Sequence, residues 1–415
     1  MVLDIMKVAP LGDKRNSDFF NEYRPKIYER RRSSGIDDLL GNLRGIVIQV
    51  QTGDAIPYLE ELYTMSPYRF DGARRNATHR IFFLRITDEQ PRLIVMEPLS
   101  PDYEDDITRF NLLYPRARST PNARYVGEIF ETKDLKETVK ILSSQEVRFH
   151  TPDEEANPFF ANEHFTFSYP SDFTGNRIGY SAVDLDDIDR IGAGEVLDLT
   201  DDERRRLRKA DEDIQKSEIL NLVLGPDHMA TRILAGERED AILEFLTMSN
   251  YYFWGAYNIA SMNSSTNVNR NPNIDDEKHS PAKVFTANNT PSFVNSFEGL
   301  PMPTENFVRN FGRRMHHMAY QVQDGDHSSG QKNIDYVVGE LKKMGVPFLA
   351  HIVGECADEP DLKQIFSKHS KYSILITEYI ERCHGYEGFF TKQNVAALTE
   401  AAGLDERYNH GHVFD

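Results

Sequence analysis

Cysteine is scarce in this sequence, and long hydrophobic runs are absent. Only Cys356 and Cys383 occur among 415 residues, which argues against a disulfide framework and favours a reducing compartment. The first residues lack a basic segment followed by a long apolar run, so we expect no signal peptide. No stretch approaches the roughly 20 apolar residues that a membrane helix requires. These absences predict a soluble, cytoplasmic protein without a membrane partner.

An excess of positive charge is also absent. The chain contains 48 Lys and Arg against 66 Asp and Glu, which gives a formal net charge of -18. A nucleic-acid-binding protein neutralises phosphates with basic side chains, so we predict no nucleic-acid partner. The fractions of charged (27%) and hydrophobic (39%) residues are ordinary for a globular protein. The length allows two domains with full cores.

The same order of elements occurs four times along the chain. An extended segment is followed by one whose apolar residues recur three and four positions apart, and then by two or three further extended segments. The first strands are expected at 43–50, 123–131, 225–234 and 314–322, and the helices at 53–65, 133–144, 237–249 and 333–345. This repeat predicts an α+β fold built from four βαβββ units.

Changes in composition divide the chain into four parts. Residues 1–40, rich in Arg, Lys and Asp, are expected to be an N-terminal surface extension, and residues 198–221 contain a charged run typical of a solvated linker helix. Residues 41–197 and 222–415 would then be two domains of two units each. We also expect residues 263–295, rich in Asn, Ser and Pro, to form a long loop.

Histidine occurs in the first strand of a unit only in the C-terminal half. His228 lies in that strand of the third unit, and His316 and His317 lie in that strand of the fourth. Consecutive residues of a strand point to opposite faces, so His316 and His317 are not expected to face one pocket together. A lone strand histidine is usually an ordinary core or surface residue. Two histidines at equivalent positions of repeated units favour a metal site.

The expected third ligand is a carboxylate near the end of the fourth unit. In the segment 372–383, Glu378 shares one strand face with three isoleucines, whereas Glu381 lies on a more polar face. An ionised carboxylate among isoleucines is unfavourable unless it is paired or binds a metal, which favours Glu378. Two imidazoles and one carboxylate on one side of an ion leave the other positions open, as in Fe(II) oxygenases.

Several motifs of the C-terminal half resemble the 4-hydroxyphenylpyruvate dioxygenases, which belong to the vicinal oxygen chelate superfamily. These motifs are "PDHMATRI", "HHMAYQV", "LKQIFSK" and "ITEYIERCHGYEGFFTKQNVAALTEAA", between about residues 222 and 403. In the N-terminal half the resemblance is one of architecture alone. It implies that the four units pair into two open-barrel domains, of which the C-terminal one is catalytic. It also implies that His228, His317 and Glu378 bind Fe(II).

The resemblance further implies a substrate site. Ser264, Asn288 and Gln364 would orient the polar end of the substrate, with Asn289 as an alternative to Asn288. Phe366 and Phe389 would enclose a ring. His316 would contact the substrate at a position where the family usually carries glutamine, and a further family glutamine has no clear counterpart. Because buried polar groups dominate discrimination between polar substrates, these departures leave the substrate open.

The implied activity is the oxidative decarboxylation and hydroxylation of an aromatic 2-oxo acid by O₂, with 4-hydroxyphenylpyruvate and its product homogentisate as the first expectation. One alternative is an oxygenase of the same superfamily that acts on another 2-oxo acid, such as a hydroxymandelate synthase-like enzyme. A second alternative is a non-catalytic ligand-binding protein. The helix near the C-terminus would act as a lid over the metal pocket, and a homo-oligomer is expected.

Overall fold

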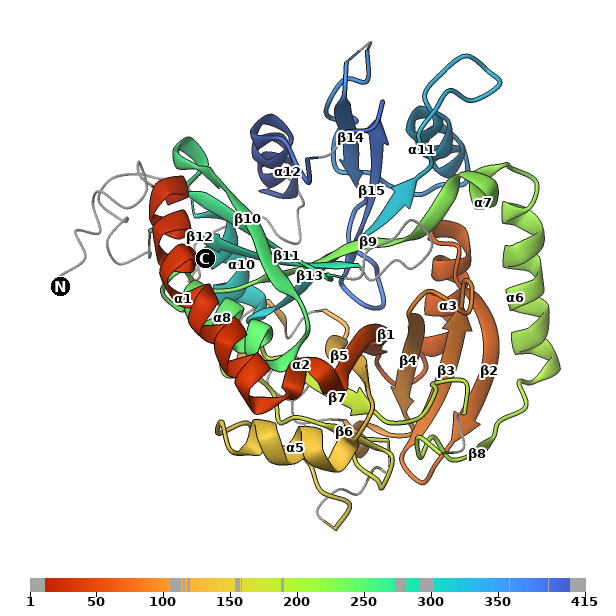
Figure 1. The fold of residues 1–415 in the computed structure, drawn as a ribbon. Helices are drawn as coiled ribbons and strands as arrows, with labels where there is room; N and C mark the ends of the chain where they lie inside the picture. Colours follow the sequence, from red (N-terminus) through yellow and green to blue (C-terminus); the bar gives the residue numbers. More distant parts are fainter. Residues whose placement is uncertain are drawn as a thin grey trace.

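The computed structural model describes residues 12–104, 113–114, 116–117, 120–153, 157, 159–187, 190–272, 281–290, 302–357, 359–386 and 388–403 (Figure 1). The helices are α1 (Gly12–Ser34), α2 (Ile36–Leu39), α3 (Ala55–Met65), η2 (Pro101–Tyr103), α5 (Leu135–Ser143), α6 (Asp201–Ile214), α7 (Ile219–Leu222), η5 (Ala235–Glu237), α8 (Arg238–Met248), η6 (Ala260–Met262), α10 (Pro303–Phe311), α11 (Asn333–Lys343) and α12 (Lys392–Gly403). The strands are β1 (Leu40–Gln49), β2 (Arg69–Arg75), β3 (His79–Arg85), β4 (Arg92–Pro98), β5 (Arg124–Thr132), β6 (Phe165–Phe167), β7 (Arg177–Ser181), β8 (Glu195–Val196), β9 (Val223–Arg232), β10 (Tyr252–Ile259), β11 (Ser264–Arg270), β12 (Ala282–Asn288), β13 (Arg314–Val322), β14 (Asp361–Phe366) and β15 (Ile376–Cys383).

Two curled mixed sheets hold the elements together (Figure 1). The strand order is β6-β7-β5-β1-β4-β3-β2-β8 in the first sheet and β10-β11-β12-β9-β13-β15-β14 in the second. In each sheet the first strands of two consecutive units pair antiparallel, β1 with β5 and β9 with β13. Each of these strands also pairs in parallel with the last strand of its own unit. The predicted α+β fold of repeated units is confirmed.

Some predicted segments differ from the structure. The repeat predicts further strands after each helix, and in units two and four the segments 147–152 and 347–353 would be the first of these. They form only isolated bridges, at Phe149, Phe348 and Val353. Units two and four therefore have one strand fewer than units one and three among the described residues.

The expected long loop at 263–295 was wrong, because it contains β11 and β12; residues 273–280 and 291–295 lie outside the described part. Its asparagines suit a buried strand because their amides are bonded internally. Asn267 donates to Ser265, and Asn269 donates to the carbonyl of Lys283.

Two helices outside the repeats pack across the molecule. The helix α1 packs on α8 and β10 of the C-terminal half (Figure 1), where Phe20 stacks on Phe253 with ring centres 4.0 Å apart. The helix α6 packs on α3 of the N-terminal half, where Arg206 pairs with Glu60 through two contacts of 2.9 and 2.5 Å. The segment before each half therefore covers the other half.

The two sheets share one hydrophobic core and several buried polar contacts. The hydroxyl of Tyr379 on β15 donates to the carbonyl of Met65 at the end of α3, at 2.7 Å. Lys283 on β12 forms an ion pair with Glu128 on β5, and both side chains are only 2% exposed. Buried polar groups that satisfy one another fix the relative position of two packed surfaces more narrowly than apolar contacts do.

Cys356 and Cys383 form a disulfide with their Cα atoms 5.7 Å apart. The cysteine count argued against a disulfide framework, and it did not predict this single bond. The pairing of β14 with β15 brings the end of β15 close to the segment before β14, which a count of cysteines does not reveal. The composition argument for a reducing compartment therefore loses its basis. No helix in the described part of the chain has the length and hydrophobicity needed to cross a membrane.

Candidate metal centre and adjoining cavity

One row of residues across the second sheet builds the candidate metal centre. His228 on β9 is the register partner of Ala319 on β13, and Ala319 is also the partner of Glu378 on β15. Register partners point to the same face of a sheet, and neighbouring strands lie about 4.8 Å apart. The small side chain of Ala319 therefore leaves space between the imidazole of His228 and the carboxylate of Glu378. His317, two residues before Ala319 on the same face, points into this space.

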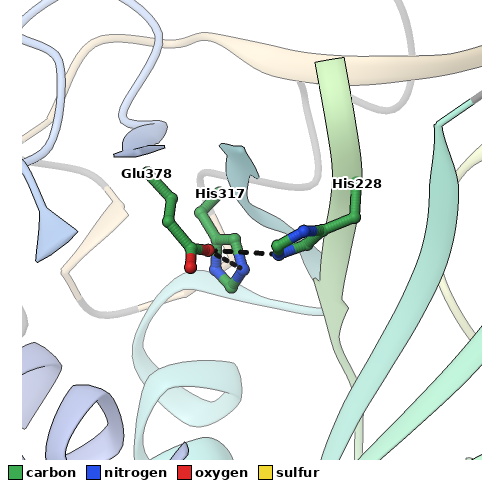
Figure 2. Close-up of side chains that lie close together, drawn as sticks. All are labelled: His228, His317 and Glu378. Atoms are coloured by element: carbon green, nitrogen blue, oxygen red, sulfur yellow. Dashed lines mark ion pairs between the residues drawn. The ribbon is translucent and has the colours of Figure 1, made fainter. Parts of the chain in front are cut away.

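The three predicted ligands converge in the structure (Figure 2). Glu378 Oε2 lies 3.1 Å from His228 Nε2 and 3.3 Å from His317 Nε2. The potential ligand atoms all lie within 4.8 Å of one another, and the three residues are buried. Figure 2 shows the carboxylate and the two rings directed at one point from three different strands.

A second layer of polar groups orients the ligands. Asp227 accepts a hydrogen bond from His228 Nδ1 at 2.7 Å and forms an ion pair with Arg382. Because a carboxylate can only accept, His228 Nδ1 carries the hydrogen and Nε2 keeps its lone pair in the neutral ring. On the other side, Gln364 donates to Glu378 Oε1 at 2.5 Å and accepts from Asn394 of α12 at 3.1 Å. The other carboxylate oxygen of Glu378 therefore faces the histidines.

Burial and the neighbouring charges set opposite pKa shifts on the two histidines. Burial lowers the pKa of His228, but the carboxylates of Glu378 and Asp227 outweigh burial and raise it to about 9. Burial holds the pKa of His317 well below its usual range, and the charges of His228 and Arg232 lower it further. Burial raises the pKa of Asp227, but Arg382 and His228 more than reverse this and hold it well below its usual value. The cluster thus attracts one positive charge, which a proton or a metal cation can supply.

The donor set fits a transition-metal ion. His228 Nε2 is buried and makes no hydrogen bond of regular geometry with any residue in the described part of the chain, although Glu378 Oε2 lies near it. Buried polar atoms without a hydrogen bond are uncommon in proteins and call for an explanation such as a bound ion. Two imidazoles and a carboxylate suit Fe(II), with open positions opposite the protein ligands.

Both adjacent histidines reach the same cavity, which alternation along a strand does not predict. On β13, Met315 pairs with Thr231 and His317 pairs with Ala230, so the register of the two strands shifts at His316, which is the extra residue on β13. Such a β-bulge interrupts the alternation of side chains. His316 and His317 consequently both line the cavity, and their Nδ1 atoms lie 2.9 Å apart. The expectation that they could not share one pocket was wrong for this reason.

A second bulge lies beside the other histidine ligand. Ala319 pairs with His228 and Tyr320 pairs with Pro226, so Asp227 is the extra residue on β9. The bulge changes the direction of the strand at Asp227, which contacts both His228 and Arg382. β-Bulges commonly lie next to functional sites, where they redirect a side chain.

The first sheet has the same registers as the second, but its described residues form no group of potential metal ligands. The pairs Gly45–Ile129 and Ile129–Gly179 correspond to His228–Ala319 and Ala319–Glu378, and Gly127 corresponds to His317. Glycine therefore occupies all three ligand positions of the N-terminal half. A Cβ atom added to Gly127 would lie 2.0 Å from the carbonyl oxygen of Arg177, and one added to Gly179 would lie 2.8 Å from the ring of Phe167. Packed core groups close to these glycines occupy the space that the ligands use in the second sheet.

A cavity adjoins His317 and Glu378. Its apolar wall is formed by Val284, Phe366, Phe390, Val395 and Leu398, and its polar wall includes Arg232, Ser264, Thr266, Thr286, Thr304 and Thr399. About 50 Å³ of it is open to the centre of a water-sized molecule. On this measure one water needs roughly 10–15 Å³, so the cavity has room for a few waters. Because α12 supplies three of the lining side chains, a larger ligand requires this helix to move.

Four of the predicted substrate residues line the cavity, namely Ser264, His316, Gln364 and Phe366. Phe389 instead packs against the ring of His228, with ring centres 5.5 Å apart, and the cavity wall is formed by its neighbour Phe390. The sequence "EGFF" does not distinguish these two phenylalanines.

Asn288 does not appear in the cavity wall. Its side-chain oxygen accepts a hydrogen bond from the backbone N–H of Glu305, and its side-chain amide donates one to the backbone carbonyl of Asn263, both at 2.7 Å. The alternative, Asn289, donates to the carbonyl of Ser264 at 2.9 Å. Both asparagines therefore hold the loop around Ser264 in the described structure.

Sequence reasoning missed Asp227, Arg232 and Arg382. The signal for two of them was present: Asp227 directly precedes a ligand histidine, and Arg382 ends the glutamate-x-isoleucine-x-arginine motif. For Arg232 the signal was weaker, since its position four residues after His228 places it on the same strand face.

Comparison with known proteins finds the fold but no close sequence relative. No family model matches the chain, and no curated protein sequence matches it. Among solved structures, a mutant 4-hydroxymandelate synthase from Streptomyces coelicolor superposes with a TM-score of 0.58 at 15% identity, over 88% of this chain and 98% of that chain. A xylose isomerase-like TIM barrel/4-hydroxyphenylpyruvate dioxygenase fusion protein superposes with a TM-score of 0.53 at 12% identity, over 87% of this chain and 52% of that chain.

The two-sheet architecture, the repeated pairing of strands and these superpositions agree with one another. They confirm, at the level of fold, the resemblance that the motifs of the C-terminal half implied. The chain has the vicinal oxygen chelate fold.

Proposed function

We propose that this chain is an Fe(II)-dependent dioxygenase that oxidatively decarboxylates and hydroxylates a 2-oxo acid. The observation that carries the proposal is the convergence of His228, His317 and Glu378 beside a cavity, with ligand atoms within 4.8 Å of one another. A ligand set on one side of an ion leaves positions for the substrate and O₂ on the other side. The fold shared with a 4-hydroxymandelate synthase is consistent with this activity.

Bound Fe(II) would supply the redox chemistry that activates O₂. His228, His317 and Glu378 would hold the ion. In the proposed reaction one atom of O₂ enters the new carboxylate and the other enters the new hydroxyl, while the old carboxylate leaves as CO₂. No separate reductant is therefore required.

The residues around the centre would orient the ligands and exclude water. Asp227 keeps the hydrogen of His228 on Nδ1, so that Nε2 can bind the ion. Gln364 engages one oxygen of Glu378, which leaves the other for the metal. Phe366 and Phe390 restrict water on the apolar side, and Asn394 connects α12 to Gln364. Movement of α12 would then both open the cavity and loosen the contact to Glu378, which supports the expected lid role.

The family resemblance makes 4-hydroxyphenylpyruvate, with homogentisate as product, the first substrate to test. Ser264, Gln364 and Phe366 line the cavity and would contact such a molecule once α12 has moved. The polar wall of the cavity also supports the alternative of an oxygenase for another 2-oxo acid. The homo-oligomeric state expected from the resemblance remains a prediction.

The test begins with metal content. Purified protein is loaded with Fe(II) under anaerobic, reducing conditions, and iron per chain is measured for the unaltered protein, for His317→Ala and for His351→Ala, which changes an exposed histidine outside the site. We expect about one iron per chain in the unaltered protein and in His351→Ala, and a loss of iron in His317→Ala. A protein that takes up no iron contradicts the proposal.

Oxygen consumption by the iron-loaded protein is then followed with 4-hydroxyphenylpyruvate and with a panel of other 2-oxo acids, and products are identified by mass. Homogentisate as product would support 4-hydroxyphenylpyruvate dioxygenase activity. A product with the new hydroxyl on the side chain would support the hydroxymandelate synthase-like alternative. Bound iron without oxygen uptake on any 2-oxo acid supports a ligand-binding protein and contradicts the dioxygenase.

A further inference from the structure

A buried arginine lies in the wall of the same cavity. Arg232 follows His228 by four residues on β9, so the two side chains share the inner face of the strand. Arg232 is 5% exposed, and its guanidinium carbon lies 4.8 Å from the centre of the Phe307 ring. Removing a guanidinium from water costs free energy that anionic or polar partners must offset.

Hydroxyl groups surround Arg232 in one row of the sheet. Thr286 on β12 is the register partner of Arg232, and Thr266 on β11 is the partner of Thr286. All three line the cavity, together with Ser264 and Thr304. A hydroxyl can donate a hydrogen bond, and a guanidinium presents donors in a fixed plane. Together they match the oxygen atoms of a carboxylate.

Arg232 and two of the candidate metal ligands, His317 and Glu378, line one cavity. Arg232 and Glu378 are the charged residues among the cavity-lining side chains of the described structure, and in the proposed function Glu378 is committed to the metal. The Cα atoms of His228 and Arg232 are separated by four residues of strand, roughly 13 Å. A compact molecule with an acid group at each end can span the two sites.

We propose that the substrate is a 2-oxo dicarboxylic acid, whose 2-oxo acid end binds at the metal and whose second carboxylate pairs with Arg232 and the neighbouring hydroxyls. This inference rests on the proposed function, since it names the substrate class of the same site. A neutral aromatic ring against Arg232 would bring no acceptor for the guanidinium donors, whereas a carboxylate would, and buried polar groups discriminate strongly between such ligands. The small volume of the cavity also favours a compact substrate.

The test is a binding measurement that needs no turnover. Protein loaded with Zn(II), which is redox-inactive, is titrated by calorimetry with 2-oxopentanedioate and with 2-oxopentanoate, which has the same chain length but lacks the second carboxylate. A desolvated charge-assisted contact predicts that the dicarboxylate binds about 10- to 100-fold more tightly. Arg232→Met should remove this preference, because it lowers the affinity for the dicarboxylate and changes the affinity for 2-oxopentanoate less than threefold. Arg232→Lys should retain part of it.

A matched control is Arg270→Met, which removes an arginine that lies near Trp254 and Phe389 but outside the cavity lining, and it should keep the preference. Equal affinity for the two acids in the unaltered protein overturns the inference, and so does a loss in Arg232→Met that is equal for both acids. If Arg232→Met does not fold, the comparison of the two acids in the unaltered protein and in Arg232→Lys decides.

The outcomes also separate this inference from the proposed function. The dicarboxylate inference alone is overturned if the protein binds metal, binds both acids equally tightly and, in its iron form, consumes oxygen. A metal-loaded protein that binds neither acid overturns the 2-oxo acid dioxygenase itself.

Discussion

Asp227 offers a sensitive test of how the candidate metal centre is organised. Its carboxylate accepts the Nδ1 hydrogen of His228 at 2.7 Å and pairs with Arg382. In Asp227→Asn the side chain loses its charge but keeps its size. An amide nitrogen directed at His228 can only donate, and it would move the imidazole hydrogen to Nε2, where the metal should bind. An amide oxygen directed at His228 would keep the tautomer but polarise the ring less.

The size of the effect follows from these contacts. Changes to groups that orient a metal-ligating histidine typically reduce metal affinity by about 10- to 100-fold, which corresponds to about 1.4–2.7 kcal/mol. Arg382 also loses the carboxylate with which it pairs. The side chains of Asp227 and Arg382 are only 9% and 17% exposed, so we expect an additional loss of about 3 kcal/mol in the free energy of unfolding.

Metal affinity is measured by competition with a chelator of known affinity, and folding is monitored by circular dichroism. The control is Asp186→Asn, which weakens an aspartate–arginine pair with Arg92 in the N-terminal half without contacting a candidate ligand. The control should bind metal as the unaltered protein does. A metal affinity of Asp227→Asn within twofold of the unaltered protein would refute the orienting role, as would an equal loss in Asp186→Asn.

Three further predictions concern Ala319 between the candidate ligands, the Lys283–Glu128 ion pair between the sheets, and the carboxyl of Glu244 on α8. Ala319→Ile should abolish metal binding without unfolding the protein, because Ile129 occupies the same register position in the first sheet; metal content and circular dichroism check this. Lys283→Met should lower the free energy of unfolding by about 3–5 kcal/mol because Glu128 stays buried without its charge partner, whereas the double variant with Glu128→Leu should recover most of the loss in urea denaturation. Burial raises the pKa of the Glu244 carboxyl from 4.5 to about 7, so the folded protein binds this proton more tightly and loses stability as pH rises between these values. The free energy of unfolding of Glu244→Gln should therefore equal that of the unaltered protein at pH 4.5 and exceed it by at most about 3 kcal/mol at pH 8. A difference in urea unfolding that stays the same at both pH values would contradict this prediction.

The sequence predicted those elements well whose side chains follow a single period. The strand at 314–322 coincides with β13, and the helix expected at 237–249 differs from α8 by one residue at each end. The strands β11 and β12 were missed because the segment that contains them is rich in asparagine, serine and proline, which are typical of loops. On β11, Asn267 donates to Ser265 and Asn269 donates to the carbonyl of Lys283 on β12, and a single sequence does not identify such partners.

The candidate site was predicted only in part for a similar reason. Glu378 was selected because a carboxylate among isoleucines needs a partner, and the structure brings it to His228 and His317. Arg232 was missed because an arginine on a strand is normally solvated. Its placement depends on curvature that turns the inner face of β9 toward the cavity, and this follows from the whole sheet rather than from the strand.

The bulges explain why alternation misjudged the adjacent histidines. A bulge is a mismatch in residue count between two strands, so it cannot be read from either strand alone. The extra residue His316 has an equivalent in Val126 of the first sheet, and the extra residue Asp227 has an equivalent in Arg44. Both bulges are therefore present in the half that carries glycines at the ligand positions. Their occurrence there indicates that the bulges belong to the fold, and that the candidate metal centre uses a backbone geometry that does not depend on metal binding.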